Sequence, residues 1–495
     1  MASTGKSKHS KARGERIEKD SLGERKVPSD AYYGIQTLRA LENFRASGVS
    51  HPESLLRAYV MIKKAAALAN EELGTLDRRR ARAVEWACDR ILAGKHHDQF
   101  KLDAFQAGAG TSYNMNVNEV VANLALERLG RRRGDYDYLS PNDHVNMAQS
   151  TNDTFPTAMN VAALLELPAL DAALRKLGSA LRSKGRQFRR IVKSGRTHLQ
   201  DAAPISLGQE FEAQALAVET GRKEIVRRSA MLHDIALGGT AVGTGLNAPA
   251  GFPQAAAKHL SRVSGLKLKP AENLIFAIQC NYRIASLSGA LRDLALELIR
   301  IANDLRLLSS GPTTGISEIT LPAVQPGSSI MPGKVNPVMA ECLDMIAFQV
   351  VGNDLATALA VQAGQFDLNV MMPSMALNVL QSMRLLANYI PDFVEKCVKD
   401  IKANKDRCSQ YSDRSLGLAT ALNPYIGYLK AAEIVHSALG SGESIRDIAI
   451  GKGILSESEF DRITNPLSDG SATDATGKKH GKSRKKPGKK RGERR

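Results

Sequence analysis

Aromatic residues and cysteines are scarce in this chain of 495 residues. Phe, Trp and Tyr together make up 5% of it, and Trp86 is the only tryptophan. The five cysteines lie far apart in the sequence, without a Cys-x-x-Cys pair. An odd number of scattered thiols argues against a disulfide framework and favours a reducing, cytoplasmic compartment.

Long hydrophobic runs and the common cofactor fingerprints are also missing. No window approaches the roughly 18 consecutive apolar residues of a membrane-spanning helix, so no membrane partner is expected. The basic N-terminus has no apolar stretch behind it and does not read as a secretory signal. No Walker-type or dinucleotide-type glycine motif occurs. His96 and His97 are adjacent while His198 and His259 stand alone, so we expect neither a metal nor a cofactor.

The net charge of +17 is concentrated in the C-terminal tail. Residues 478–495 hold eleven Lys or Arg against one Glu, which leaves the rest of the chain only mildly basic. This tail could contact nucleic acid or an anionic surface non-specifically. It could also be a solvated extension that aids solubility, since no aromatic residue interleaves with its charges to stack on bases. We predict a disordered basic arm over 1–15 and a disordered basic tail over 467–495.

Apolar residues recur at three- and four-residue spacing through much of the chain, which predicts a mainly α fold. The longest such segments begin near residues 155, 206, 279 and 338, and each exceeds the mean helix length of about 11–12 residues. Helices of this length imply a bundle packed lengthwise. Their apolar residues occupy more than one face, as in the core of an oligomer. We expect an N-terminal domain over 16–148, a central helical bundle domain over 149–400 and a small C-terminal helical domain over 401–466.

Cap and turn signals mark two places in this helical background. In VPSDAYYGIQTLRALENF, where ordered structure begins, Ser29 or Asp30 is the predicted N-cap. Within the last helical module, LNPYIGY is expected to be an irregular joint, because it combines Pro and Gly.

Four segments rich in small polar residues interrupt the helical pattern: GAGTSYNMN (108–116), MAQSTNDTFPT (147–157), SGRTHLQD (194–201) and GSSIMPGKVNP (327–337). Each one alone is explained by helix capping and turns. Together they hold more hydrogen-bonding groups than capping needs. Pooled, these donors could hold a small anion with two carboxylates, each contributing roughly 1.5–3 kcal/mol.

These segments resemble the characteristic regions of the aspartase/fumarase superfamily, in the expected order. GSSIMPGKVNP is similar to the signature loop of that superfamily, and GGTAVGTGLN (238–247) and GQFDLNV (364–370) match as well. The resemblance covers about residues 16–465. It implies a three-domain lyase fold whose central long-helix bundle assembles a homotetramer, with each active site built from segments of three subunits.

Within the superfamily, the sequence resembles the aspartase branch more than the fumarase branch. DAYYGIQTLRALENF (30–44) is similar to aspartases, where fumarases usually carry a Trp-Gly-Ala-Gln-Thr version. GAGTS, QSTND and THLQD lean the same way. The implied activity is that of a carbon–nitrogen lyase, which removes ammonia from L-aspartate to give fumarate. The alternative is a class II fumarate hydratase, which interconverts malate and fumarate.

The resemblance assigns the chemistry itself to three residues. Ser328 would be the base that removes the proton from C3, with His198 and Lys334 as further catalytic residues. Proton removal leaves an aci-carboxylate, a dianion, so preorganised donors around one carboxylate should dominate catalysis. The departing amine is already protonated and needs no general acid.

A second set of residues is implied to bind the substrate. Its members are polar residues of the four segments: Thr111, Ser150, Thr151, Asn152, Thr197, Ser329, Lys334 and Asn336. The hydroxyls of the first two segments, with the Ser329 backbone, would hold the carboxylate beside C3. The other carboxylate would be held by Thr197, Lys334 and Asn336. Asn152 would lie near the amino group, together with His198.

A hypothesis of another class also stays open at this point. The scaffold could be catalytically silent, with the basic tail acting as a module that binds RNA or an anionic surface. The intact SGRTHLQD and GSSIMPGKVNP segments argue against a silent scaffold.

Overall fold

The computed structural model describes residues 14–467, and the predicted basic arm and tail fall almost entirely outside that range. The described chain is mainly helical, which confirms the predicted fold class. It divides into two compact units. The first consists of Met1–Ala180, Ala215–Arg306 and Pro322–Asp400, and the second of Leu181–Gln214, Leu307–Leu321 and Ile401–Arg495. The boundaries of the three expected domains stay a prediction.

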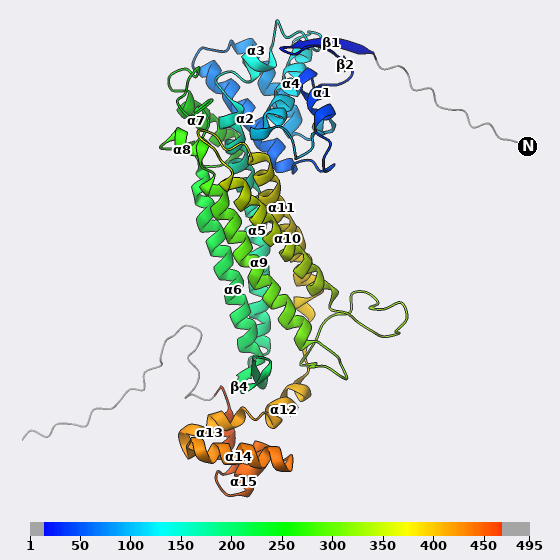
Figure 1. The fold of residues 1–495 in the computed structure, drawn as a ribbon, viewed down its shortest axis with the longest axis vertical. Helices are drawn as coiled ribbons and strands as arrows, with labels where there is room; N and C mark the ends of the chain where they lie inside the picture. The colour runs from blue at the N-terminus through cyan, green and yellow to red at the C-terminus, as the bar shows by residue number, and fades with distance from the viewer. Residues whose placement is uncertain (1–13, 468–495) are drawn as a thin grey trace, which may run out of the picture. The chain divides into compact units, whose positions relative to one another are not determined.

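Shorter helices of the first unit gather at one end of its long helices (Figure 1). They are α1 Ile35–Asn43, α2 Glu53–Glu72, α3 Arg78–Leu92, α4 Thr111–Arg128, α7 Phe252–Ser264 and α8 Leu274–Gln279. Helix α2 is central to this group, because 15 of its 20 residues are buried. Most of these are Ala, Leu and other apolar residues, but Lys63 is buried among them.

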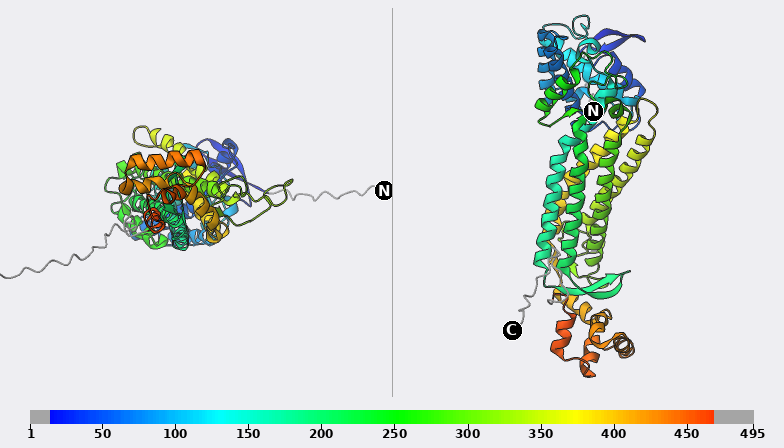
Figure 2. Two further views of the ribbon diagram at one scale, coloured as in Figure 1. Left: turned by 90° about the horizontal axis from the view of Figure 1, so that it is seen from below. Right: turned by 90° about the vertical axis from the view of Figure 1, so that its left-hand side faces the viewer.

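Long helices form the bundle that the apolar periodicity predicted. They are α5 Thr151–Gln187, α6 Leu207–Ser229, α9 Tyr282–Leu308, α10 Val338–Gln362 and α11 Met372–Lys396. Figures 1 and 2 show the parts of these helices that belong to the first unit running side by side. In α9, Leu287, Leu291 and Leu294 are at most 1% exposed, at the spacing that places them on one buried face. Gly221 of α6 permits a close approach there, since a Cβ on it would lie 2.8 Å from Leu294.

One face of α10 is apolar and exposed in the single chain. Met345, Phe348, Leu355 and Leu359 are each between 56% and 63% exposed. Within the described residues, α5 and α10 are long and apolar enough to cross a membrane, a test that core helices of soluble proteins also pass. An exposed apolar row on a bundle helix more often marks a surface where protein chains associate.

The strands of the described chain form four separate pairs. These are β1 Glu15–Asp20 with β2 Gly23–Pro28, β3 Val192–Thr197 with β4 Gln200–Ser206, β5 Asp234–Ile235 with β6 Lys269–Pro270, and β7 Ile319–Thr320 with β8 Lys402–Ala403. Three pairs are antiparallel, and the β5–β6 pair is parallel. The β3–β4 hairpin belongs to the second unit and carries the SGRTHLQD segment.

The C-terminal helices of the second unit are short. They are α12 Lys405–Arg414, α13 Leu418–Ile426, α14 Tyr428–Ser441, α15 Ile445–Gly451 and α16 Glu457–Thr464. Leu422, Ile434 and Phe460 lie in their common core, each at most 2% exposed. The predicted irregular joint in LNPYIGY is confirmed, because Gly427 separates α13 from α14 with a φ of 83°.

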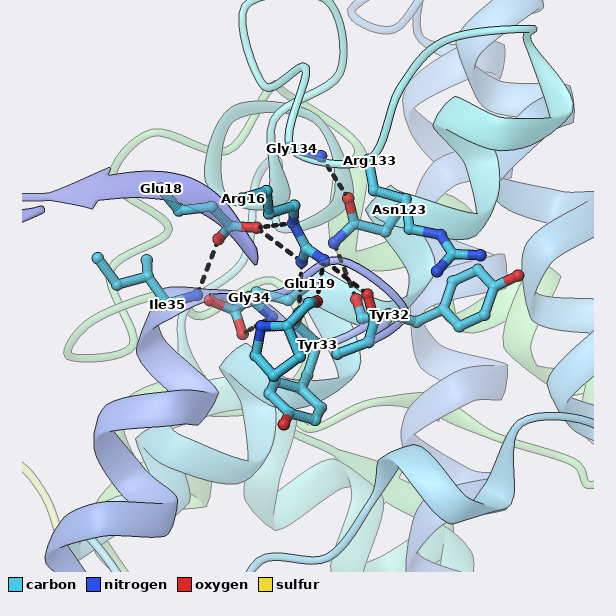
Figure 3. A network of polar contacts seen from close by, with 12 residues as sticks. Arg16, Glu18, Tyr32, Tyr33, Gly34, Ile35, Glu119, Asn123, Arg133 and Gly134 are labelled. Atoms are coloured by element: carbon cyan, nitrogen blue, oxygen red, sulfur yellow. Dashed lines mark hydrogen bonds and ion pairs between the residues drawn. The ribbon is translucent and has the colours of Figure 1, made fainter. Parts of the chain in front are cut away.

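The predicted N-cap of the first helix is wrong. Helix α1 begins at Ile35, with Gly34 rather than Ser29 or Asp30 at the cap position. A carboxylate from another helix does the capping: Glu119 of α4 accepts hydrogen bonds from the backbone N–H groups of Gly34 and Gln36, each 2.8 Å long. Figure 3 shows Glu119 beside Gly34, within a wider network of polar contacts.

A second carboxylate completes this network at the start of α1. Glu18 accepts a hydrogen bond of 2.8 Å from the backbone N–H of Ile35 and pairs with Arg16 (Figure 3). Burial raises the pKa of Glu119 to about 7, while the donors around it act in the opposite direction. The AYYGIQT stretch is therefore anchored by buried carboxylates from β1 and α4.

Candidate active site

The N-terminal ends of α4 and α5 lie side by side in the first unit. Thr111 is the first residue of α4, and Thr151 is the first residue of α5. Asn114 joins them, because its Nδ2 donates a 3.0 Å hydrogen bond to Thr151 Oγ1. Unpaired backbone N–H groups and the helix dipole make helix N-termini favourable places for anions. We call Thr111, Ser150, Thr151 and Asn152 the α4–α5 cluster.

A buried carboxylate attaches a third segment to this cluster. Asp153 of α5 is fully buried and accepts hydrogen bonds of 2.9 Å from the backbone N–H groups of Ser150, Gly238 and Thr240. Asn152 Nδ2 donates to the carbonyl oxygen of Ala241 over 2.7 Å. The GGTAVGTGLN segment is thereby fixed against the start of α5. Burial raises the pKa of Asp153 to about 7, and its three backbone donors oppose that shift.

A fourth segment, GQFDLNV, is bonded to the turn that leads into α4. The backbone N–H of Ala109 donates a 2.7 Å hydrogen bond to the carbonyl oxygen of Val370. Asn369 is 1% exposed, and its side chain donates to the carbonyl oxygens of Ala360 and Val361 over 3.0 Å each. Four of the segments singled out in the sequence therefore meet at one place, although up to about 260 residues separate them in the chain.

Behind the cluster lies a buried lysine that the sequence analysis did not identify. Lys63 of α2 is fully buried, and its Nζ donates to the side-chain oxygens of Asn114, Asn146 and Gln149 over 2.7, 3.0 and 2.9 Å. These amides also brace the turn before α5, where Ala148 has a φ of 62°. An unusual backbone angle in a non-glycine residue persists only where neighbouring contacts hold it.

The segment 327–337, which we call the signature loop, is held mainly by its own backbone. The backbone N–H of Gly327 donates to the carbonyl oxygen of Lys334 over 2.8 Å, and Asn336 Nδ2 donates to that of Gly327 over 2.7 Å. Ser328 Oγ accepts hydrogen bonds from the backbone N–H groups of Ile330 and Met331, of 3.2 and 3.1 Å. Ser329 and Lys334 are exposed, whereas Ser328 and Asn336 are half-buried.

Thr197 and His198 lie on the β3–β4 hairpin of the second unit. Thr197 ends β3, and the two turn residues His198 and Leu199 both have positive φ, of 55° and 61°. Glu318, which is 0% exposed, stabilises the hairpin through ion pairs with Lys193 at 3.1 Å and Arg196 at 2.9 Å. The hairpin is thus built to present Thr197 and His198 at a tight two-residue turn.

The predicted site residues fall into three groups in the single chain. The α4–α5 cluster unites four of them, the signature loop carries four, and the hairpin carries two. Among the described residues, no hydrogen bond or ion pair joins the signature loop to the α4–α5 cluster. No group of three His, Cys, Asp or Glu residues in 14–467 lies close enough together to hold a metal ion.

Family comparisons identify the class of protein that this fold and these segments define. The lyase family matches residues 23–352, and the fumarase C C-terminus family matches residues 418–468. The chain belongs to the aspartase/fumarase superfamily of lyases. The predicted superfamily, lyase fold and enzyme class, a carbon–nitrogen lyase, are confirmed.

Individual relatives narrow the resemblance further. The chain is 49% identical to the aspartate ammonia-lyase of Bacillus subtilis (strain 168) over 451 residues, covering 91% of this chain and 95% of that protein. It is 46% identical to the aspartate ammonia-lyase of Escherichia coli (strain K12), covering 90% of this chain and 94% of that one.

Solved structures show the same architecture. A fumarate lyase:delta crystallin from Brucella melitensis bound to cobalt has a TM-score of 0.88 and 50% identity, over 92% of this chain and 99% of that one. A class II fumarase from Schistosoma mansoni has a TM-score of 0.87 but only 39% identity, over 92% and 98% of the two chains.

Proposed function

We propose that the protein catalyses the reversible elimination of ammonia from L-aspartate to give fumarate. The observation that carries this proposal is the α4–α5 cluster, where hydroxyl and amide groups converge at two helix N-termini. Identities of 46–49% to aspartate ammonia-lyases, against 39% to a class II fumarase, favour aspartate over malate. These identities agree with the resemblance of AYYGIQT, GAGTS and THLQD to the aspartase branch.

The difficult step is the removal of a weakly acidic proton from C3 of the substrate. The electrons left on C3 move into the neighbouring carboxylate, which becomes a dianionic aci-carboxylate before the C2–N bond breaks and ammonia leaves. Thr111, Ser150 and Thr151 are the donors we assign to that carboxylate, with the Ser329 backbone. Donors already fixed in place stabilise the dianion more than the substrate, and losing one typically raises the barrier by about 2.7–4 kcal/mol.

Ser328 is the proposed base. Its Oγ already accepts two backbone N–H hydrogen bonds, from Ile330 and Met331, and donors of this kind stabilise a negative oxygen. Lys334 in the same loop adds a positive charge. The assignment rests on the whole motif, since the same contacts also occur in ordinary serine turns.

The remaining groups would bind the other end of the substrate. Thr197, Lys334 and Asn336 are assigned to the second carboxylate, and Asn152 and His198 to the region of the amino group. Asn336 already uses one amide hydrogen to close the signature loop on Gly327, which leaves the other amide hydrogen for the substrate.

The reach of the chain suggests that several copies share each site. Helix α5 contains 37 residues, so at about 1.5 Å per residue its ends are about 50 Å apart. The ten residues from Gln187 to Thr197 span at most about 35 Å when fully extended. For any arrangement of the two units, Thr197 therefore cannot reach Thr151 of its own chain. A site that uses both residues needs a second chain.

The exposed face of α10 supports assembly into the proposed homotetramer. Its row of Met, Phe and Leu side chains is exposed in the single chain, and covering apolar surface contributes about 25 cal/mol per Å². Packing α10 against another copy would cover this row. We propose a cytoplasmic homotetramer that needs no added cofactor.

A substrate comparison tests the proposed reaction. The purified full-length protein is incubated separately with L-aspartate and with L-malate, and fumarate formation is followed. The reverse reaction is run with fumarate, with and without ammonium, and the products are separated. We expect fumarate from L-aspartate, and L-aspartate from fumarate only when ammonium is present. Conversion of malate without conversion of aspartate would establish the fumarate hydratase alternative instead.

A further inference from the structure

Lys63 is a charged group placed where burial is costly, and the proposed reaction steps do not use it. It is fully buried in α2, and an ammonium group is rarely buried without strong compensation. Three side-chain amide oxygens surround its Nζ within 3.0 Å. A neutral amine has only two hydrogens to donate, so three acceptors at this distance indicate the protonated form.

The charge fixes the direction of the next hydrogen bond. Only an oxygen can accept from the Lys63 ammonium, so the Asn114 amide must turn its Oδ1 toward Lys63 and its Nδ2 toward Thr151. Thr151 Oγ1 then receives a hydrogen bond, which leaves its own hydrogen to be donated elsewhere. In the described part of the chain, no hydrogen bond takes that hydrogen.

We propose that Lys63 is a positioning residue, which acts through Asn114 to orient and polarise the Thr151 hydroxyl toward the substrate carboxylate. This inference rests on the proposed function, because it concerns the same carboxylate. The chain of donors runs from the Lys63 ammonium to Asn114, then to Thr151, and then to the substrate. Hydrogen bonds that point the same way along such a chain strengthen one another.

The arrangement favours the transition state over the bound substrate. The carboxylate beside C3 carries one negative charge in the substrate and approaches two in the aci-carboxylate. A cation three hydrogen bonds away along this chain therefore stabilises the second state more than the first. Loss of the Lys63 charge should lower kcat with little change in KM.

Other groups facing Lys63 set its own ionisation. Burial lowers the pKa of Lys63 to about 7, and the carboxylate of Asp153 on α5 opposes that shift. The thiol of Cys88 on α3 also faces it, and burial raises the pKa of that thiol. Asp153 is thus the nearby acid that acts against the effect of burial on Lys63, while its carboxylate oxygens are bonded to the 238–240 backbone and Ser150.

The first test replaces Lys63 by methionine, which has a similar volume and no charge. For Lys63→Met we expect kcat on L-aspartate to fall by about 10- to 100-fold, with KM changed less than about threefold. Lys184→Met is the matched control: Lys184 is also a buried lysine, but it bonds Gln187 and the carbonyl oxygen of Ile401 in the second unit. Its kcat should stay within about twofold of the wild type.

A double-mutant cycle separates a positioning role from a merely structural one. If Lys63 acts through the Thr151 hydroxyl, Lys63→Met should have little further effect on kcat once Thr151→Val has removed that hydroxyl. An equal fold-loss from Lys63→Met in both backgrounds would overturn the proposal.

A second variant keeps the proposal testable if Lys63→Met does not fold. Asn114→Asp preserves the size of the side chain and its pairing with Lys63, but it presents an acceptor to Thr151 instead of a donor. The Thr151 hydrogen would then turn back toward the aspartate, and kcat should fall at least 10-fold. Asn118→Asp is the matched control, because Asn118 lies one turn further along α4 and bonds Asn146, not Thr151.

The two proposals fail in different ways. If the wild-type protein does not act on L-aspartate, the proposed function is wrong whatever the variants do. If the wild type is active and both Lys63→Met and Asn114→Asp fold and keep full kcat, the proposed function stands and the role of Lys63 is refuted.

Discussion

The α4–α5 cluster and the signature loop are both assigned to the same reaction, yet they are built in opposite ways. The cluster is braced from several helices by buried groups, among them Lys63, Asn114 and Asp153. The loop bonds mainly to itself, and Ile330 within it is 83% exposed. Figure 1 shows the segment before α10 extending away from the long helices.

Two glycines with nearly the same φ show how differently the cluster and the loop are packed. Gly110 precedes α4 at its cap position with a φ of 80°, and Gly333 lies in the signature loop with a φ of 81°. A Cβ on Gly110 would overlap the Phe155 ring, whereas a Cβ on Gly333 would have no atom within 4 Å. The groups assigned to the carboxylate are therefore fixed in advance, whereas the proposed base lies on a loosely packed segment.

The largest expected effect is a loss of kcat, caused by a substitution in the signature loop that leaves the fold intact. Ser328→Ala removes the proposed base, so kcat on L-aspartate should fall by about 10²- to 10⁴-fold. Because Ser328 bonds only neighbouring backbone groups, the free energy of unfolding should change by no more than about 0.5 kcal/mol. Steady-state kinetics and thermal denaturation measure the two quantities.

The neighbouring serine is the matched control for that experiment. Ser329 is assigned only a backbone role, so Ser329→Ala should keep kcat within a few-fold of the wild type. A Ser328→Ala enzyme with kcat close to the wild-type value, or an equal loss in both variants, would contradict the assignment of the base.

The glycine pair tests the contrast in stability directly. Gly110→Ala combines a left-handed backbone angle with a clash against Phe155, so it should lower the free energy of unfolding by about 3 kcal/mol. Gly333→Ala meets only the backbone penalty and should lower it by about 1 kcal/mol. Chemical denaturation of both variants is the measurement. Equal losses would show that the two regions are not packed as differently as described.

An effect smaller than that of Gly110→Ala is expected in the segment that leads into the cluster. Asp103 accepts hydrogen bonds from the backbone N–H groups of Ser47, Gly48 and Phe105, and these lower its pKa to about 2 against the opposing effect of burial. Asp103→Asn should therefore lower the free energy of unfolding by about 1–2 kcal/mol near neutral pH.

The pH dependence of that loss follows from the lowered pKa. A carboxylate with a folded pKa of about 2 and an unfolded value of 3.8 stabilises the fold above about pH 4 and loses this contribution as the pH falls toward 2. The difference between wild type and Asp103→Asn should shrink over the same range. Asp98→Asn, at an exposed site nearby, should change stability by less than about 0.5 kcal/mol at every pH.

Much of the helical architecture could be predicted from the sequence, because apolar spacing directly reports which face of a helix is buried. The segment expected to begin near residue 338 is α10, Val338–Gln362, and the one expected to begin near 206 is α6, Leu207–Ser229. The hairpin at SGRTHLQD could not be predicted. Its turn uses His198 and Leu199 at positive φ, where Asn or Gly would have given a recognisable signal.

The candidate site could be predicted only where its residues belong to conspicuous polar segments. Thr111, Ser150 and Thr151 stand in conspicuous polar segments, whereas Lys63 lies inside an alanine-rich helix and its partners come from distant parts of the chain. Glu119 caps α1 from 85 residues away in the sequence, so no local sequence pattern could predict this cap. Buried polar networks depend on which segments meet in space. The sequence signal that such a network leaves is a polar residue at a helix position where an apolar residue is expected.

The length of α5 has a consequence for heredity. If Thr151 and Thr197 serve one site but come from different chains, two separate copies damaged at these two residues could rebuild some intact sites when mixed in one assembly. A cell carrying both alleles would recover part of the activity that neither allele provides alone. Conversely, an allele damaged at both residues would impair sites made partly from healthy chains, and the loss would exceed its share of the protein.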